Sequence, residues 1–186
     1  VYLQKDALFG MLGVSNGMIK GNVDELAPTP QDDNIHKSPA IYLKGGFDKQ
    51  LAEKLRVRLS ASYYTNNSSG ANTLYGGDRT GSNYFMAMEK AIATPATATA
   101  PAVKSSYASQ AFSGRFNPGF GKKVNALQLN GFAKIAGLEL FGTYERASGR
   151  SKAETSMRDV NQIALDGVYR FGKNENLFLG ARYNTV

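Results

Sequence analysis

The sequence predicts an all-β protein, an antiparallel transmembrane β-barrel with up-and-down (meander) connections and about nine strands. Apolar and polar residues alternate over stretches of roughly ten positions, and a tilted strand needs about 9–11 residues to cross a bilayer. The stretches come in closely spaced pairs, which is typical of hairpins. Because half of each barrel strand faces a polar interior, such a chain can cross a membrane without a long apolar run.

The clearest alternation lies in three hairpins. In the hairpin over residues 125–147, Leu127 and Leu129 alternate with Gln128 and Asn130. The expected strands are, in chain order, Ala7–Lys20, Pro39–Asp48, Lys54–Thr65, Asn83–Lys90, Ser105–Phe116, Asn125–Ile135, Leu138–Ala147, Val160–Phe171 and Glu175–Thr185. Glycines blur the alternation in the first of these strands, and the fourth and fifth are short.

Connections of two lengths separate these strands. Short links follow Asp48, Ile135 and Phe171, whereas the longer segments are rich in Asn, Asp, Gly, Pro and Ser, as loops are. The long segments are Gly21–Ser38, Asn66–Ser82, Asn117–Lys123 and Ser148–Arg158. Short turns at one end and long loops at the other are typical of outer-membrane barrels. Ala91–Val103 is the exception, since it falls on the short-turn side yet is long, and its Ala, Thr and Pro content predicts a low-complexity, poorly ordered segment.

The chain is expected to form a single transmembrane barrel domain over residues 1–186. Nine strands is an odd number, whereas bacterial single-chain barrels normally have an even one. The ninth expected strand also ends at Val186, where a long loop is expected to begin. We therefore expect the chain to be part of a longer barrel.

The more apolar face of each strand is assigned to lipid, because an Arg or Lys there costs about 2–4 kcal/mol at the bilayer midplane. In the strand Lys54–Thr65 we expect Leu55, Val57, Leu59 and Ala61 to face outward and Arg56, Arg58, Ser60 and Ser62 to face inward. The same rule applied to every strand yields candidate pore-lining residues. They are Lys44, Arg56, Arg58, Lys134, Glu139, Glu145, Asp166, Arg170 and Arg182.

Basic residues predominate among these candidates, so we expect a cationic lining that favours anions. The alternative is that the charges pair across neighbouring strands and only solvate the barrel wall. Arg56 and Arg58 are the least easily neutralised of them. The acids nearest to them, Asp48 and Glu53, are expected at the turn of the hairpin.

Composition argues against several other functions. The chain has no cysteine, which excludes disulfides and thiolate metal sites, and its net charge of +7 is spread through the strands, so we expect no nucleic-acid partner. His36, the only histidine, lies near Asp32 and Asp33 without a nucleophile, so we expect no enzyme and no catalytic residue. The loop acids Asp24, Glu25, Asp32 and Asp33 lack the spacing of a calcium loop, and we expect no metal and no cofactor.

Aromatic residues are abundant, with ten Tyr and ten Phe. Most of the tyrosines lie near strand centres or ends, where they would form an aromatic belt at the membrane interface. The alternative is a track on which sugars stack. The tyrosines in question are Tyr2, Tyr42, Tyr63, Tyr64, Tyr84, Tyr144, Tyr169 and Tyr183.

Repeated hairpin segments such as Leu177–Asn184 (LFLGARYN) and Leu140–Arg146 (LFGTYER) resemble those of bacterial outer-membrane porins, in particular the porin-like barrels of Bacteroidota. The resemblance covers about two thirds of the chain and contains no diagnostic motif. It implies a barrel in the Gram-negative outer membrane, surrounded by lipid and lipopolysaccharide, often trimeric, that passes small polar solutes by diffusion. The alternative is a barrel without a channel, acting as an adhesin or as a structural subunit of an envelope complex.

Overall fold

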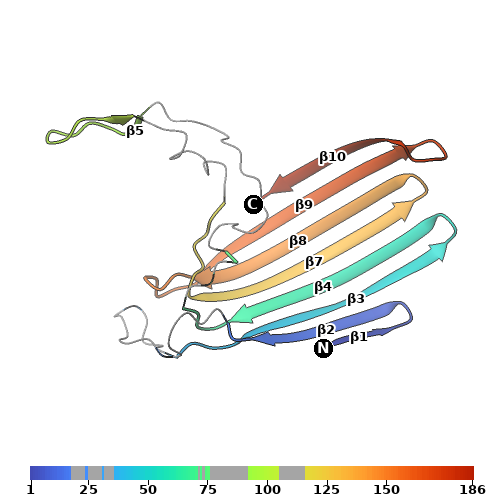
Figure 1. Ribbon diagram of the computed structural model, residues 1–186, viewed down its shortest axis with the longest axis horizontal. Helices are drawn as coiled ribbons and strands as arrows, with labels where there is room; N and C mark the ends of the chain where they lie inside the picture. Colours follow the sequence, from blue (N-terminus) through green and yellow to red (C-terminus); the bar gives the residue numbers. More distant parts are fainter. Residues whose placement is uncertain are drawn as a thin grey trace. The chain divides into compact units, whose positions relative to one another are not determined.

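The computed structural model describes residues 1–17, 24, 31, 36–70, 72, 74–75, 92–104 and 116–186, and this part of the chain is all-β (Figure 1). Its strands are β1 (Tyr2–Lys5), β2 (Leu8–Ser15), β3 (Ala40–Ala52), β4 (Leu55–Asn66), β5 (Ile92–Thr94), β6 (Val103–Lys104), β7 (Lys123–Ile135), β8 (Leu138–Arg150), β9 (Arg158–Phe171) and β10 (Leu177–Thr185). Eight of them form one sheet, in the order β1-β2-β3-β4-β7-β8-β9-β10. That sheet belongs to one compact unit, Val1–Asn72 with Phe120–Val186, while β5 and β6 belong to a second, Thr73–Gly119.

The sheet is an antiparallel meander in which β4 pairs directly with β7. The pairing runs the whole length of β4, from Leu55 to Asn66. Two further strands, Asn83–Lys90 and Ser105–Phe116, were expected at this place. The first lies outside the described residues, as does the second apart from Phe116. Residues 67–122 form one long connection between neighbouring strands.

The connections of the sheet alternate strictly in length. The short ones cover residues 6–7, 53–54, 136–137 and 172–176, and the long ones cover residues 16–39, 67–122 and 151–157. Figure 1 shows all the short turns at one end of the sheet. The apparent exception, Ala91–Val103, lies inside the longest connection and so no longer breaks the rule. It was also expected to be poorly ordered, but Ile92 pairs with Lys104 there in a small β5–β6 hairpin.

Strand bounds differ from the predicted ones mainly at the first two hairpins. An additional strand, β1, pairs with β2 through a turn at Asp6 and Ala7, and β2 ends at Ser15 instead of Lys20. Strand β3 continues past the predicted end at Asp48 to Ala52. Alternation is hard to detect at these places because glycines interrupt it in β2 and charged residues interrupt it in β3.

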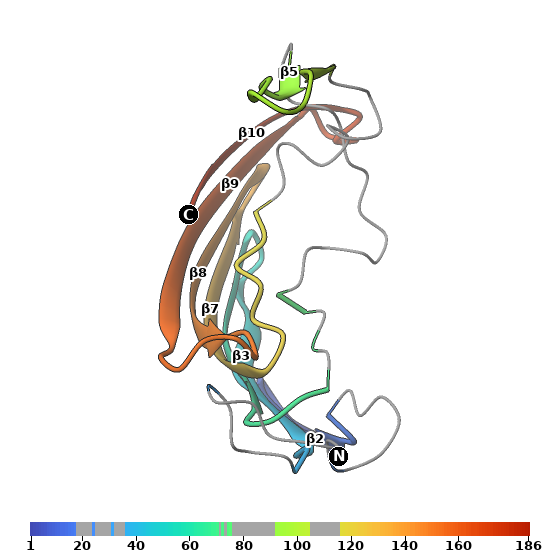
Figure 2. The same ribbon diagram turned by 90° about the vertical axis from the view of Figure 1, so that its left-hand side faces the viewer.

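The two faces of the sheet carry different residues, as predicted. On β4, Leu55, Val57, Leu59 and Ala61 lie on one face and Arg56, Arg58, Ser60 and Ser62 on the other. Figure 2 shows that the sheet is curved. The segment that follows β4, residues 67–70, and the segment that precedes β7, residues 120–122, lie on its concave side. Phe120, in one of these segments, packs on Gly149, which shares the face of Arg56. The polar face is therefore concave and the apolar face convex.

The convex face leaves large apolar side chains exposed on every long strand. Leu59 is 57% exposed, Leu165 55% and Leu179 70%. The buried apolar residues of the described chain are few and mostly small: Ala40, Phe120, Val124, Ala126, Ala147 and Ala164. A water-soluble sandwich would cover such a face with a second layer, and no second layer covers it among the described residues.

Glycines let aromatic rings lie flat against the concave face. A Cβ at Gly46 would lie 2.4 Å from the ring of Phe9, and a Cβ at Gly149 would lie 2.4 Å from the ring of Phe120. Each ring thus occupies the space that a side chain on the next strand would need. Both positions are intolerant of larger residues.

The described strands do not close into a barrel, because β1 and β10 are the two edges of the sheet. The predicted closed barrel is thus replaced by an open, curved, antiparallel sheet that is compatible with part of a barrel wall. Among the described residues, no helix has the length and apolar character needed to cross a membrane.

Candidate functional site

The concave face brings together all the candidate pore-lining residues predicted from the sequence. Strand pairing places on this one face, across β3, β4, β7, β8, β9 and β10, the residues Lys44, Arg56, Arg58, Lys134, Glu139, Glu145, Asp166, Arg170 and Arg182. The period-two pattern was sufficient for this placement. It could not show which charges are neighbours, because neighbours on a sheet come from different strands.

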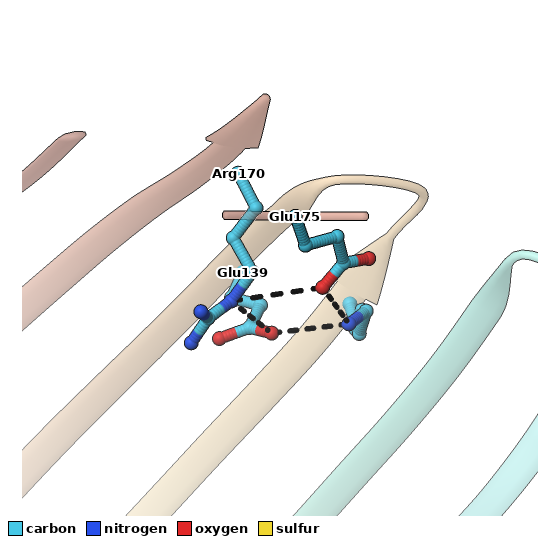
Figure 3. A network of polar contacts seen from close by, with 4 residues as sticks. Glu139, Arg170 and Glu175 are labelled. Atoms are coloured by element: carbon cyan, nitrogen blue, oxygen red, sulfur yellow. Dashed lines mark hydrogen bonds and ion pairs between the residues drawn. The ribbon is translucent and has the colours of Figure 1, made fainter. Parts of the chain in front are cut away.

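Near the short turns, four of the charged side chains form a closed network (Figure 3). Glu139 Oε1 lies 3.2 Å from both Lys134 Nζ and Arg170 Nε, and Glu175 Oε2 lies 3.5 Å from Lys134 Nζ and 3.9 Å from Arg170 Nε. Glu175 comes from the β9–β10 turn and was not predicted to take part. Two cations and two carboxylates balance here, so this turn-end network supplies no net charge.

A second group of charges, the basic cluster, consists of Lys44, Asp48, Arg56 and Arg58. Arg56 donates two hydrogen bonds to Asp48, of 2.9 and 2.8 Å, and Arg58 Nη1 lies 3.8 Å from the same carboxylate. Lys44 has no ion-pair partner among the residues that the structure describes. The cluster therefore holds three cations and one carboxylate, which leaves a formal surplus of two positive charges.

The expectation that Asp48 lies at the turn of the hairpin, where it would neutralise Arg56 and Arg58 poorly, is wrong. The β3–β4 hairpin turns at residues 53–54, so Asp48 lies within β3 and directly opposite Arg58. Alternation of faces puts Asp48 and Arg58 on the same side of this hairpin. The position of the turn was misjudged, and with it the partner of both arginines.

The remaining predicted charges also have partners, one an opposite charge and one a neutral amide. Arg182 Nε lies 3.6 Å from Asp166 Oδ1, and Glu145 accepts a 3.1 Å hydrogen bond from Gln128. Both alternatives predicted from the sequence, a cationic surface and charges paired across strands, thus apply to different parts of the concave face. Cross-strand pairing neutralises most of the charges, and the basic surplus is concentrated in the basic cluster.

A groove crosses the concave face beside the basic cluster, with a volume of about 570 Å³. Among the residues that the structure describes, its lining comes from β3, β4, β7 and β8 and contains no acidic residue. The lining residues are Lys44, Arg56, Arg58, Ser60, Gln128, Asn130, Phe132, Phe141 and Thr143. Asp48 lines a neighbouring hollow over β1, β2, β3 and β4, which shares Lys44, Arg56 and Arg58 with the groove.

Polar side chains of this groove form a hydrogen-bonded ladder. Thr143 donates to Asn130 at 2.9 Å, Asn130 donates to Gln128 at 3.2 Å, and Gln128 donates to Glu145 at 3.1 Å. The Glu145 carboxylate accepts only, so it fixes the orientation of both amides. The groove therefore presents its polar groups in a preset arrangement.

The tyrosines do not form a single belt. Tyr2, Tyr42 and Tyr64 lie on the concave face, where the rings of Tyr42 and Tyr64 are 5.0 Å apart. Tyr63, Tyr144, Tyr169 and Tyr183 lie on the convex face, and Tyr84 lies outside the described residues. The belt expectation is thus wrong for the first three, because neighbouring residues of a strand, such as Tyr63 and Tyr64, face opposite ways.

At the end of the sheet opposite the short turns, the ends of the longest connection are fixed to their neighbours. Ser69 donates its backbone N–H to Lys122 at 2.9 Å, and Lys122 donates to Arg150 at 3.1 Å. Asn72 donates from its side chain to the Tyr64 hydroxyl at 2.7 Å. These segments lie over the concave face and narrow the space above it.

The connection between β8 and β9 is held by one carboxylate. Glu154 accepts hydrogen bonds from Arg158 at 2.6 Å and from the Ser151 backbone at 2.7 Å. These contacts, the Arg158 guanidinium first, lower the pKa of Glu154 to about 2. Arg158 also lies 5.2 Å from the centre of the Phe120 ring, which links this connection to the longest one.

His36 has a partner that the sequence did not predict. It forms an isolated β-bridge and an exposed side-chain contact with Asp24, whereas Glu25, Asp32 and Asp33 lie outside the described residues. No group of three or more His, Asp or Glu side chains suited to a metal ion occurs among the residues that the structure describes.

The chain matches no known family model, and no curated protein or solved structure matches it either. The two faces of the sheet therefore provide the evidence for function.

Proposed function

We propose that this chain forms part of the wall of a porin-type barrel in a bacterial outer membrane, through which small polar solutes diffuse. The observation that carries the proposal is the contrast between the two faces of the sheet. The convex face exposes apolar side chains such as Leu59 and Leu165, and the concave face carries most of the charges and amides. The convex face does carry one ion pair, Arg146–Asp159, toward the long-connection ends of β8 and β9. Lipid would cover the first face, and water would fill the space along the second.

Connection lengths support the same proposal. Turns of two to five residues at one end, and connections of seven residues or more at the other, match the periplasmic and extracellular ends of such barrels. The sheet is also curved as a barrel wall is (Figure 2).

We further propose that the pore prefers anions. The turn-end network is neutral, so the preference would come from the basic cluster, where Lys44, Arg56 and Arg58 outnumber Asp48. Fixed positive charge lowers the energy of an entering anion and raises that of a cation. Salt would weaken this effect, since the Debye length is about 8 Å at physiological ionic strength.

Planar-bilayer recording of the purified protein tests both proposals. We expect stepwise conductance and, in a salt gradient, a reversal potential on the anion side. Replacing Arg56 and Arg58 by serine should move the reversal potential toward cations. Asp48→Asn is the matched variant of opposite sign and should move it further toward anions, because it leaves Arg56 and Arg58 without their carboxylate.

An unchanged reversal potential in both variants would show that the basic cluster lies outside the constriction. Absence of conductance would favour a second candidate function, a barrel without a channel that acts as an adhesin or envelope subunit. One observation supports that alternative: the ends of the longest connection, near Asn72 and Lys122, already lie over the concave face.

A further inference from the structure

We infer that the groove on the concave face is a binding site for a sugar acid, a monosaccharide that carries a carboxylate. The inference rests on the proposed pore function in that it names the solute class that the pore selects. Its evidence is separate, because it comes from the side chains that meet in one groove of about 570 Å³. Small-molecule sites commonly have volumes of about 300–1,000 Å³.

The anionic group would be held by the basic side of the groove. Arg58 is the best placed, since its guanidinium lies 3.8 Å from Asp48, too far for a hydrogen bond, and its side chain is 45% exposed. Arg56, by contrast, uses two donors on Asp48. Lys44 adds a second cation. It has no ion-pair partner in the described part of the chain. A carboxylate fits the forked donors of a guanidinium.

The sugar ring would lie on the aromatic floor of the groove. Phe132 is paired with Arg58 on one side and with Phe141 on the other, so an arginine and two aromatic residues follow one another across β4, β7 and β8. The Arg58 guanidinium itself lies 5.0 Å from the centre of the Phe9 ring. Phe141 is 40% exposed, so part of its ring surface is open to a ligand. Exposed rings beside charged groups offer a surface for the C–H face of a sugar.

The hydroxyl groups would meet the polar ladder. Asn130 and Thr143 occupy the pair of positions next to Phe132 and Phe141 along the same two strands. The ladder uses one N–H of each amide, so the second N–H of Asn130 and of Gln128 is left for a ligand. The aromatic floor, the polar ladder and the cations thus match the ring, the hydroxyl groups and the carboxylate of one sugar acid.

Calorimetric titration of the full chain in detergent micelles tests the inference, with glucuronate as the probe and glucose and acetate as its neutral and ring-free counterparts. We expect glucuronate to bind about tenfold or more tightly than either, since a charge-assisted contact and ring stacking each contribute. Arg58→Gln should weaken glucuronate binding about tenfold. Phe141→Leu should weaken glucuronate binding and leave acetate binding unchanged.

Arg182→Gln is the matched control, because it removes a cation from the same face outside the groove. Equal weakening by Arg58→Gln and Arg182→Gln would overturn the inference, as would equal affinity for glucuronate and glucose. The test does not need an open pore. Conductance without glucuronate binding would overturn the groove assignment alone, and binding without conductance would support the groove and refute the proposed pore.

Discussion

Replacing Ile163 by arginine tests whether the convex face lies in a bilayer. Ile163 is 45% exposed and is the sixth of the fourteen residues of β9, between Tyr144 and Thr185 on the neighbouring strands. Near the midplane, an arginine facing lipid costs about 2–4 kcal/mol. We therefore expect Ile163→Arg to shift the folding equilibrium in vesicles by about 30- to 1,000-fold.

Two variants control for the position and for the charge. Gln162 is the preceding residue, faces the concave side and pairs with Glu145, so Gln162→Arg should change stability by about 0.5 kcal/mol or less. Leu177 is 67% exposed at the turn end of β10, where an arginine should cost only about 0–1 kcal/mol.

The assay is urea titration of the protein folded into phospholipid vesicles, monitored by far-ultraviolet circular dichroism and by the gel mobility of the folded form. The expected order of destabilisation is Ile163→Arg, then Leu177→Arg, then Gln162→Arg. Equal effects of Ile163→Arg and Gln162→Arg would refute the assignment of the convex face to lipid, because an aqueous surface would accept arginine on either side.

Two further predictions concern local structure. Glu154 has a pKa lowered from 4.5 to about 2, so its contacts should stabilise the β8–β9 connection fully above pH 4.5 and be lost as the pH falls toward 2. The protection of the Ser151 amide from hydrogen exchange, relative to the intrinsic rate at each pH, should therefore fall over that range, and Glu154→Gln should abolish the pH dependence of this protection. A Cβ at Gly137 would lie 2.5 Å from the carbonyl oxygen of Arg170, so Gly137→Ala should destabilise the sheet by about 1–3 kcal/mol in urea titration. Gly131→Ala should be tolerated, because its Cβ would meet only ordinary contacts; comparable loss in both variants would contradict this explanation.

Local pattern was enough to predict the class of the fold and the face of every candidate residue. Neighbouring residues of a strand point to opposite faces whatever the rest of the chain does, so Arg56 and Leu55 were separated correctly. Tight turns are also local, and the turn after Ile135 was located to the residue. Turns without such a clear pattern, as after β3, were misplaced.

Pairing between distant strands was beyond the sequence pattern. Arg58 and Phe132 are neighbours in the sheet although a connection of more than fifty residues separates their strands. No local rule shows that β7 follows β4, because many strand orders bury the same faces. The groove depends on this pairing, because its described lining comes from β3, β4, β7 and β8.

The sequence by itself determined an all-β chain with one apolar and one charged face, because the period of two is a property of each strand alone. Only the tertiary structure decided how the charges combine. It placed Asp48 beside Arg56, added Glu175 to the turn-end network and left the positive surplus in the basic cluster. Charges interact through space, and the distances between them are set by strand order and register.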